Sequence, residues 1–386
     1  MARMSRGSEG RRDVRHDETT RAPRRCLAAW GAWLLLAVLG ACAPGDRAER
    51  AAEADAALAD DGAVRTTSLA DADAAPYVVS EVEEVFEDAN GSVWLALHQQ
   101  PALVRIVFGD ATRADTLGAL GNQPGEFRMP FTVMQGAQGQ VFTLDGIAQR
   151  LVGFTATGAP ADVFAVPSSV DQFTTRRDTL GAWVSLLGQR ARNDSAPLVR
   201  ALDAQVDTLA FVHVPAATVS IPMGPRTYVA APEFAPRDLW GLLPDGTVWI
   251  ARGGSHVVEY VRADGTRVLA GPRAFTPVRS TDADRGLLRG LPAPADVPVE
   301  ALQYAPVKGP FLEARGAADG TVWTWRTQRS PATAERYTVF QPGVAETFDV
   351  ILPLHHRVVG LGAQAVYVAE RLDDGRSRVT RHPRPQ

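Results

Sequence analysis

Cysteine is nearly absent from this sequence of 386 residues, and both of its cysteines, Cys26 and Cys42, lie close to the amino terminus. The chain beyond Cys42 therefore has no thiol. This absence excludes disulfide bridges, cysteine-ligated metals, thiol nucleophiles and a Cys-x-x-Cys-His haem attachment from everything that follows.

Strong charge and the familiar catalytic motifs are missing as well. The formal net charge is −4, which argues against electrostatic capture of nucleic acid. The chain has no His-Glu-x-x-His zinc helix, Gly-x-Ser-x-Gly nucleophile turn, phosphate-binding loop or EF-hand spacing. We therefore predict no catalytic residue, no metal and no cofactor apart from a lipid.

No hydrophobic run is long enough to span a membrane. The longest, Leu27 to Gly40, has about fourteen residues where a span needs about twenty, and it follows an arginine-rich stretch, as in a signal peptide. It ends in Leu39-Gly40-Ala41-Cys42, which resembles a bacterial lipobox. The resemblance implies a diacylglyceryl group on Cys42 and, because Ala43 follows, delivery to the outer membrane. We predict a signal peptide over 1–41 and an alanine-rich flexible tether over 42–62.

What the sequence does contain is a repeated turn followed by alternating apolar residues and one aromatic, a pattern typical of a short strand. A further apolar stretch follows each copy. Units of roughly forty residues, enlarged twice by insertions, fill the chain from about residue 63. The aromatic residues of the six copies are Trp94, Phe142, Trp183, Trp249, Trp323 and Tyr367.

A unit of this kind cannot bury its own faces, so the copies must pack on one another. A β-sandwich could supply such a turn and a core aromatic, but six copies in series with matching following strands exceed what a sandwich needs. We predict an all-β, six-bladed β-propeller over residues 63–386, with the aromatic residues packed between blades.

One unit resembles a known repeat in detail. A glycine-rich stretch from Gly121 to Gly125 precedes Phe127 and Pro130, and the next strand ends in Asp145. Arg150 and Phe154 follow, and the spacing resembles an NHL-type propeller repeat. The resemblance implies that Asp145 is a turn acid that accepts hydrogen bonds from loop amides. With its insertions, the chain resembles uncharacterised six-bladed propeller lipoproteins of Gram-negative bacteria.

Closing the ring requires a strand from outside the last unit. That unit ends at Gln386 after its third strand, so an amino-terminal strand is needed to complete the sheet and cover its edge. Residues 64–69 are the first strand-like piece after the tether and are our candidate. Of the two insertions, the proline-rich 205–239 is predicted as an inter-blade loop, and 271–310 is predicted to contain short helices near 281–304.

The best candidate site is a rim of the central funnel. Six residues lie three positions after the aromatics and leave their strands at one rim: Leu97, Asp145, Leu186, Arg252, Arg326 and Glu370. Arg252, Arg326 and Glu370 come from consecutive units and, with Asp145, could bind an anionic small molecule, a glycan or a peptide carboxylate through arginine forks. The alternative is that these are ordinary rim charges in mutual salt bridges.

Histidines offer no convincing metal site. His98 and His256 belong to units one and four, on opposite sides of a six-fold ring. His355 and His356 are adjacent in one strand, so they point to opposite faces. We expect these residues to be structural or solvated.

Together these patterns predict a lipoprotein of the cell envelope that faces the periplasm or the cell surface. We expect it to act as a binding or scaffold module for a small molecule, glycan or envelope protein, with the membrane as partner through its lipid and without nucleic acid. The rival hypothesis is a metal-dependent hydrolase or lyase, similar to propeller lactonases, that uses the central funnel. Fold alone does not choose between them.

Overall fold

The computed structural model describes residues 64–97, 100, 102–107, 112–167, 175–187, 195–202, 205–215, 219–223, 226–284, 302–329 and 332–385. All of them belong to one compact unit, Ala56–Gln386. The predicted signal peptide and tether lie outside these ranges. So does most of the predicted helical insertion at 281–304, of which 285–301 is not described.

The repeated turns form the hairpins between the first and second strands of the sheets. Glycine occupies a positive φ in five of them, which a residue with a Cβ rarely tolerates. These glycines are Gly91, Gly139, Gly181, Gly246 and Gly320. In one hairpin Asp88 also accepts the backbone N–H groups of Asn90 and Ser92, at 2.9 and 3.0 Å. Local chemistry therefore sets the spacing at which each aromatic strand begins.

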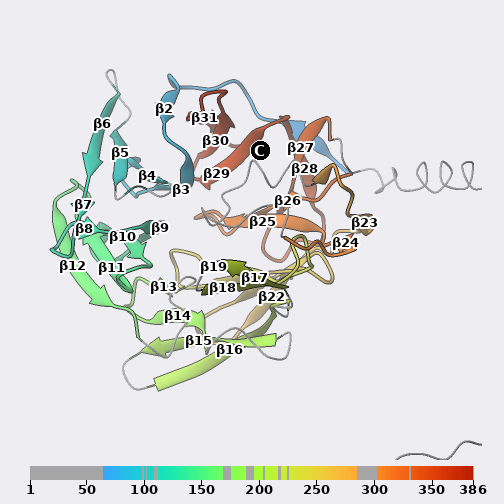
Figure 1. Cartoon of the computed structure of the whole chain (residues 1–386), viewed down its shortest axis with the longest axis horizontal. Coiled ribbons are helices and arrows are strands. Elements are labelled where there is room, and N and C mark those ends of the chain that lie inside the picture. The colour runs from blue at the N-terminus through green and yellow to red at the C-terminus, as the bar shows by residue number, and fades with distance from the viewer. Residues whose placement is uncertain are drawn as a thin grey trace, which may run out of the picture. The chain divides into compact units, whose positions relative to one another are not determined.

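Each unit contributes one sheet, and the six sheets surround a central axis with their first strands innermost (Figure 1). The chain is a six-bladed β-propeller. Blade 1 contains β3 (Val82–Glu87), β4 (Val93–Leu97), β5 (Leu103–Val107) and β6 (Arg113–Leu117), and blade 2 contains β9 (Pro130–Gln135), β10 (Val141–Asp145), β11 (Arg150–Phe154) and β12 (Pro160–Ala165). Blade 3 contains β13 (Arg176–Arg177), β14 (Trp183–Leu186), β15 (Ser195–Leu202) and β16 (Gln205–His213).

Blade 4 contains β19 (Leu239–Leu242), β20 (Val248–Arg252), β21 (Val257–Val261) and β22 (Arg267–Ala270). Blade 5 contains β25 (Phe311–Gly316), β26 (Val322–Arg326), β27 (Ala334–Phe340) and β28 (Phe348–Pro353), and blade 6 contains β29 (His356–Leu361), β30 (Ala365–Arg371) and β31 (Ser377–Pro383). Within each blade neighbouring strands are antiparallel, and the aromatic strand is always the second.

Shorter elements decorate the blades. A parallel pair, β7 (Ala119–Leu120) and β8 (Glu126–Phe127), leads into blade 2, where a 3-10 turn spans Ala137–Gly139. The region predicted as an inter-blade loop contributes β16 and a separate hairpin of β17 (Val219–Met223) and β18 (Arg226–Ala230). Strands β23 (Val278–Arg279) and β24 (Val307–Lys308) pair at the base of the second insertion.

An amino-terminal strand closes the ring, as predicted, but it is not the predicted one. Blade 6 is completed by β2 (Tyr77–Val79), which pairs antiparallel with β31 and lies beside it in Figure 1. The candidate 64–69 was wrong: β1 (Thr66–Ser68) instead adds to blade 5, parallel to β28. Thr66 to Ser68 carry no large apolar side chain, whereas Tyr77 and Val79 pack into the core between blades 6 and 1. The strand with apolar side chains takes the place where they can be buried.

The hydrophobic core is divided into six clusters, one between each pair of neighbouring blades. Trp94 and Phe154 pack between blades 1 and 2, for example, and Trp323 and Val358 between blades 5 and 6. The other clusters join blades 2 and 3, 3 and 4, 4 and 5, and finally 6 and 1. Five of the six repeat aromatics are at most 5% exposed, which confirms their role in packing between blades. Burial thus depends on neighbours around a closed ring.

Candidate functional site

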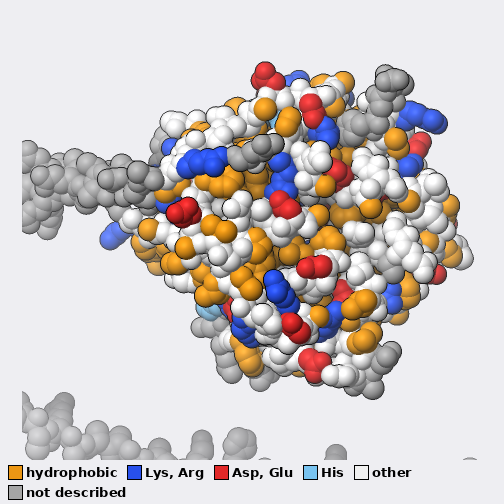
Figure 2. Space-filling view, turned by 180° about the vertical axis from the view of Figure 1, so that it is seen from behind, with side chains coloured by type: hydrophobic (Ala, Val, Ile, Leu, Met, Phe, Trp, Pro, Cys, Tyr) orange, Lys and Arg blue, Asp and Glu red, His pale blue; other side chains and the backbone are white. Residues whose placement is uncertain are grey.

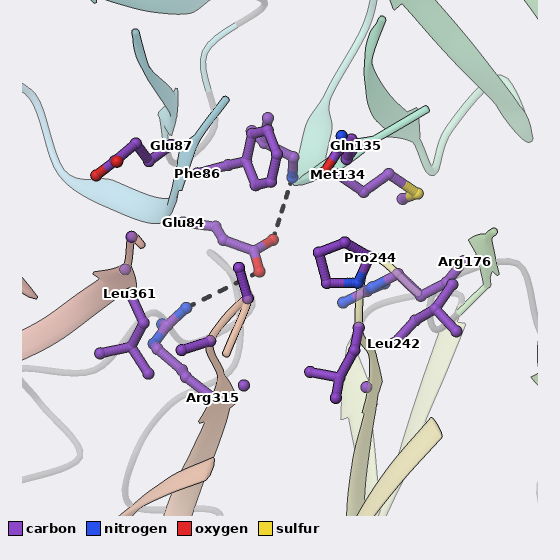
Figure 3. Close-up of a pocket in the computed structure, with 18 of the residues that line it drawn as sticks. Glu84, Phe86, Glu87, Met134, Gln135, Arg176, Leu242, Pro244, Arg315 and Leu361 are labelled. Carbon is purple, nitrogen blue, oxygen red and sulfur yellow. Dashed lines mark hydrogen bonds and ion pairs between the residues drawn. The ribbon is translucent and has the colours of Figure 1, made fainter. Parts of the chain in front are cut away.

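A pocket lies on the axis at the end of the inner strands, and all six blades line it. Its volume is about 350 Å³. The inner strands supply most of the wall, and the turns that follow them supply most of the rest (Figure 3). One lining residue from each blade in order is Phe86, Met134, Arg176, Leu242, Arg315 and Leu361. We call this cavity the axial pocket.

Small residues on the inner strands let an indole approach the pocket wall. Trp249 follows the turn of blade 4 and lines the pocket, although it is only 5% exposed. A Cβ on Gly241 would lie 2.5 Å from its Cζ2, and one on Gly316 would lie 2.3 Å from its Nε1. The ring therefore fits between the inner strands of blades 4 and 5 only because both positions are glycine.

Charged side chains on the inner strands link four blades across the axis. The Glu84 carboxylate accepts the backbone N–H of Val133 at 3.1 Å and lies 4.0 Å from the Arg315 guanidinium (Figure 3). Arg315 also lies 3.6 Å from Glu313 and donates from Nε to the carbonyl of Val358 at 3.0 Å. These contacts join blades 1, 2, 5 and 6.

Glu313 extends this network beyond the axial pocket. It sits two residues before Arg315 on β25, so it shares the same strand face, nearer the start of the strand. The Nε of Arg357 donates to Glu313 at 3.1 Å. Burial opposes ionisation of Glu313, but Arg357 and Arg315 outweigh it and lower the pKa of the carboxyl below its usual value. Glu313 is therefore a carboxylate held between two cations.

Two consecutive arginines begin blade 3 and face different surroundings. The guanidinium of Arg177 lies 3.7 Å from the centre of the Phe164 ring and donates to the carbonyl of Gly181 at 3.2 Å. Burial lowers the pKa of Arg177, although Asp178 and Asp162 partly compensate. Arg176 lines the axial pocket, and among the described residues its guanidinium makes one hydrogen bond, to the carbonyl of Thr175 at 3.4 Å. Figure 3 shows it across the pocket from Glu84.

The rim residues proposed from the sequence lie at the other end of the aromatic strands from the axial pocket. Arg252 donates to Asp238 at 2.7 Å, to Glu259 at 3.1 Å and to the carbonyl of Phe211 at 2.7 Å. None of the four proposed residues is among the residues that line the axial pocket. Their role in ligand binding stays a prediction.

The other three proposed residues also have partners. Asp145 is buried and accepts the backbone N–H groups of Arg128, Met129 and Ala148, which confirms it as a turn acid. Arg378 donates to Glu370 at 2.7 Å. Arg326 donates to Asp349 at 3.0 Å and lines a side groove together with Arg273, Arg329 and Arg336. The side groove that Arg326 lines includes neither Arg252 nor Glu370.

The described histidines are not gathered into a site. His256 is 1% exposed and packs against Phe311 and Phe340, while His98 lies outside the described residues. Within the described ranges, no three His, Cys, Asp or Glu side chains lie close enough to share a metal ion. No helix in the described part of the chain is long and apolar enough to cross a membrane.

Surface charge does not single out a second site on the face shown in Figure 2. Arginine, aspartate and glutamate side chains are interspersed there with apolar ones, without a broad field of one sign. The axial pocket, to which all six blades contribute, is our candidate site.

Sequence reasoning missed the axial pocket because it followed the aromatic strands instead of the strands before them. A signal was present, since charged residues interrupt apolar inner strands. Glu84 lies in Val82–Glu87, and Glu313 and Arg315 lie at alternate positions in Phe311–Gly316. Charged residues at alternate positions of an inner propeller strand would have predicted a site at the axis.

The comparisons identify no family. No protein-family model matches the sequence, and no curated protein matches it. Among solved structures, a Bacteroides fragilis protein described as exported is 9% identical with a TM-score of 0.49, covering 83% of this chain and 99% of that one. Virginiamycin B lyase from Staphylococcus aureus is 9% identical with a TM-score of 0.39, covering 81% and 99%. Regucalcin, a calcium-binding protein from Agrobacterium tumefaciens, is 13% identical with a TM-score of 0.41, covering 83% and 97%.

Proposed function

We propose that this protein is a ligand-binding module tethered to the cell envelope, and that its ligand occupies the axial pocket. One observation carries the proposal: every blade contributes side chains to a single cavity of about 350 Å³. Most ligand pockets are concave, largely apolar and equipped with a few charged groups, within about 300–1,000 Å³. Phe86, Met134 and Leu242 supply the apolar wall, and Glu84, Arg176 and Arg315 supply the charge.

The ring itself suits a binding role. The apolar wall residues Phe86, Met134 and Leu242 also pack in the inter-blade clusters, so the packing of the ring holds the wall in place. Sites on such rigid strands lose little conformational entropy when they bind, which favours affinity. The network of Glu84, Arg315 and Glu313 further fixes the charged groups before any ligand arrives.

A blocked pocket tests the proposal. Gln135 ends an inner strand and lines the axial pocket, whereas Gln123 is exposed on the lead-in to the same blade and is not among the lining residues. We expect compounds from a general fragment library, detected by ligand-observed NMR, to bind the wild-type protein and Gln123→Trp but to lose binding in Gln135→Trp. Equal binding to both variants, or no fragment bound by the wild type, would contradict the proposal.

The tether is proposed from the sequence alone. The charged lead, the short apolar run and Leu39-Gly40-Ala41-Cys42 support a diacylglyceryl anchor on Cys42, with the propeller in the periplasm or at the surface. Growth with labelled palmitate should label the wild-type protein and leave Cys42→Ser unlabelled, with Cys26→Ser as the matched control. A labelled Cys42→Ser protein would show that the anchor is elsewhere.

Metal content separates binding from the rival hypothesis of a metal-dependent hydrolase or lyase. We expect inductively coupled plasma mass spectrometry to find no stoichiometric metal in the dialysed protein. Calcium or zinc retained at one ion per chain would favour the enzyme and count against the binding module.

A further inference from the structure

The axial pocket holds charged groups of both signs, and nearly all of them already have strong partners. The Trp94 indole donates to Asp88 at 2.9 Å, and the backbone N–H of Ala182 donates to Asp178 at 2.8 Å. The Tyr367 hydroxyl donates to Glu87 at 2.5 Å. Glu84 and Arg315 face each other, and Arg177 lies on the Phe164 ring. These side chains need no ligand to satisfy them.

Arg176 is the exception. Its one hydrogen bond among the described residues is long, at 3.4 Å, and goes to the carbonyl of the preceding residue. No ion pair of Arg176 occurs within the described part of the chain, although the side chain is half-buried in the axial pocket. A guanidinium has five N–H donors and cannot be neutralised by losing its proton. The side chain is only partly covered, and its single partner among the described residues leaves most of these donors open to an acceptor in the pocket.

The backbone places Arg176 and Arg177 on opposite faces of blade 3. Successive residues of a strand point to opposite sides, and Arg177 is fixed on the other side by Phe164 and Gly181. Both arginines pair with the aromatic strand, Arg176 with Val184 and Arg177 with Trp183. Arg176 therefore points away from blade 2, and although both arginines line the axial pocket, only the guanidinium of Arg177 is held on the Phe164 ring.

We propose that the axial pocket binds a small organic monocarboxylate, with the carboxylate on the Arg176 guanidinium and an apolar body against Phe86, Met134 and Leu242. The inference rests on the proposed function, because it names the ligand class of the same pocket. A guanidinium fork matches the two oxygens of a carboxylate and forms two parallel, charge-assisted hydrogen bonds.

The other wall limits the charge of the ligand. Glu84 and Glu87 come from blade 1, and Figure 3 shows Glu84 across the pocket from Arg176. A second negative group, or the dianion of a phosphate monoester, would meet these carboxylates and be repelled. The volume of about 350 Å³ lies at the lower end of ligand pockets. A single carboxylate on a compact apolar body fits both limits.

Three compounds of one shape test the ligand class: 4-bromobenzoate, 4-bromobenzamide and 4-bromobenzylamine. Titration calorimetry on the wild-type protein should give at least about tenfold tighter binding of the benzoate than of the amide, because a charge-assisted hydrogen bond contributes about 10- to 100-fold. The anomalous signal of bromine in co-crystals should place the ring in the axial pocket. The amine should bind no better than the amide.

Variants at Arg176 complete the test. Arg176→Met should lower benzoate affinity by about tenfold or more while amide affinity stays within about twofold, and Arg176→Lys, which keeps the charge but loses the fork, should lie between. Arg376→Met, on the exposed ion pair with Asp374, should behave as wild type. Unfolding curves should show that all the variants fold.

The outcomes are separable. Four results would overturn the carboxylate assignment. They are equal binding of benzoate and amide, a benzoate preference that survives in Arg176→Met, a preference for the amine, and no binding of any of the three compounds. In each case the proposed function still stands if library fragments bind the wild type and are excluded by Gln135→Trp. If no fragment occupies the axial pocket, the proposed function fails and the ligand class with it.

Discussion

Acidification below pH 6.5 should destabilise this propeller through one buried imidazole, that of His256. The ring packs among Phe275, Phe311 and Phe340, its Nε2 lies 3.2 Å from the Thr324 hydroxyl, and its buried Nδ1 has no hydrogen-bond partner. Burial, with smaller contributions from Arg326 and Arg273, lowers the pKa of His256 to about 3. The native protein therefore keeps this side chain neutral well below the pH at which the unfolded chain protonates it.

The sign and size follow from proton linkage. The folded pKa is about 3, below the ordinary value of 6.5, so the stabilisation is fully present above pH 6.5 and is lost as the pH falls towards about 3. Each pH unit below 6.5 costs about 1.4 kcal/mol of unfolding free energy. Between pH 7.5 and 5.0 the loss from this one group is about 2 kcal/mol.

The assay compares the wild-type protein with His256→Asn by urea unfolding, followed by tryptophan fluorescence at several pH values. Asparagine tolerates the positive φ of 48° found here and cannot take up a proton. Because other groups titrate equally in both proteins, the stability difference between them should shrink by about 2 kcal/mol from pH 7.5 to 5.0. Parallel pH profiles would refute the reasoning.

Three further predictions concern the ring. Gly360→Ala should cost about 1–3 kcal/mol, because its Cβ would lie 2.6 Å from the carbonyl oxygen of Val85, whereas Gly254→Ala, with open space around it, should change the free energy of unfolding by less than about 1 kcal/mol; equal effects in urea unfolding would contradict this. The chain's only lysine, Lys308, donates to the buried Asp284 at 2.5 Å. Lys308→Met should therefore lower the free energy of unfolding by about 3–5 kcal/mol, and adding Asp284→Asn should recover part of this loss, because it removes the unpaired buried charge. No recovery in the same urea assay would argue against a buried charge as the cause. Deletion through residue 80, which removes β2, should lower the free energy of unfolding by about 3–6 kcal/mol. The loss should be clearly larger than for deletion through residue 70, because β2 contributes side chains to the core between blades 6 and 1. Similar losses would mean that β2 does not close the ring.

The number of blades could be predicted from the sequence because each repeat carries its own local sequence pattern. The turn glycines, the alternation of the strands and the aromatic that follows each turn lie within a few residues of one another. Asp145 could be interpreted for the same reason, since the amides that it binds lie in the neighbouring loop and turn of the same blade. Local patterns of this kind need no knowledge of distant contacts.

The closing strand could not be predicted in the same way. Residues 64–69 and Tyr77–Val79 are both short and strand-like, and the choice depends on which side chains a wedge between the first and last blades can bury. The partners of the charged rim residues could not be predicted either. Arg252 finds Asp238 and Glu259 on neighbouring segments, and no spacing rule along the chain predicts that pairing.

The repeat pattern is enough to predict an all-β chain whose copies must pack on one another, because each copy exposes apolar faces that it cannot bury alone. Where the ring closes and which side chains line the axis depend on contacts between distant parts of the chain. Glu84, Arg176 and Arg315 are far apart in the chain and become neighbours of one pocket because six inner strands converge on a common axis. Their chemistry is therefore a property of the closed ring and not of any single repeat.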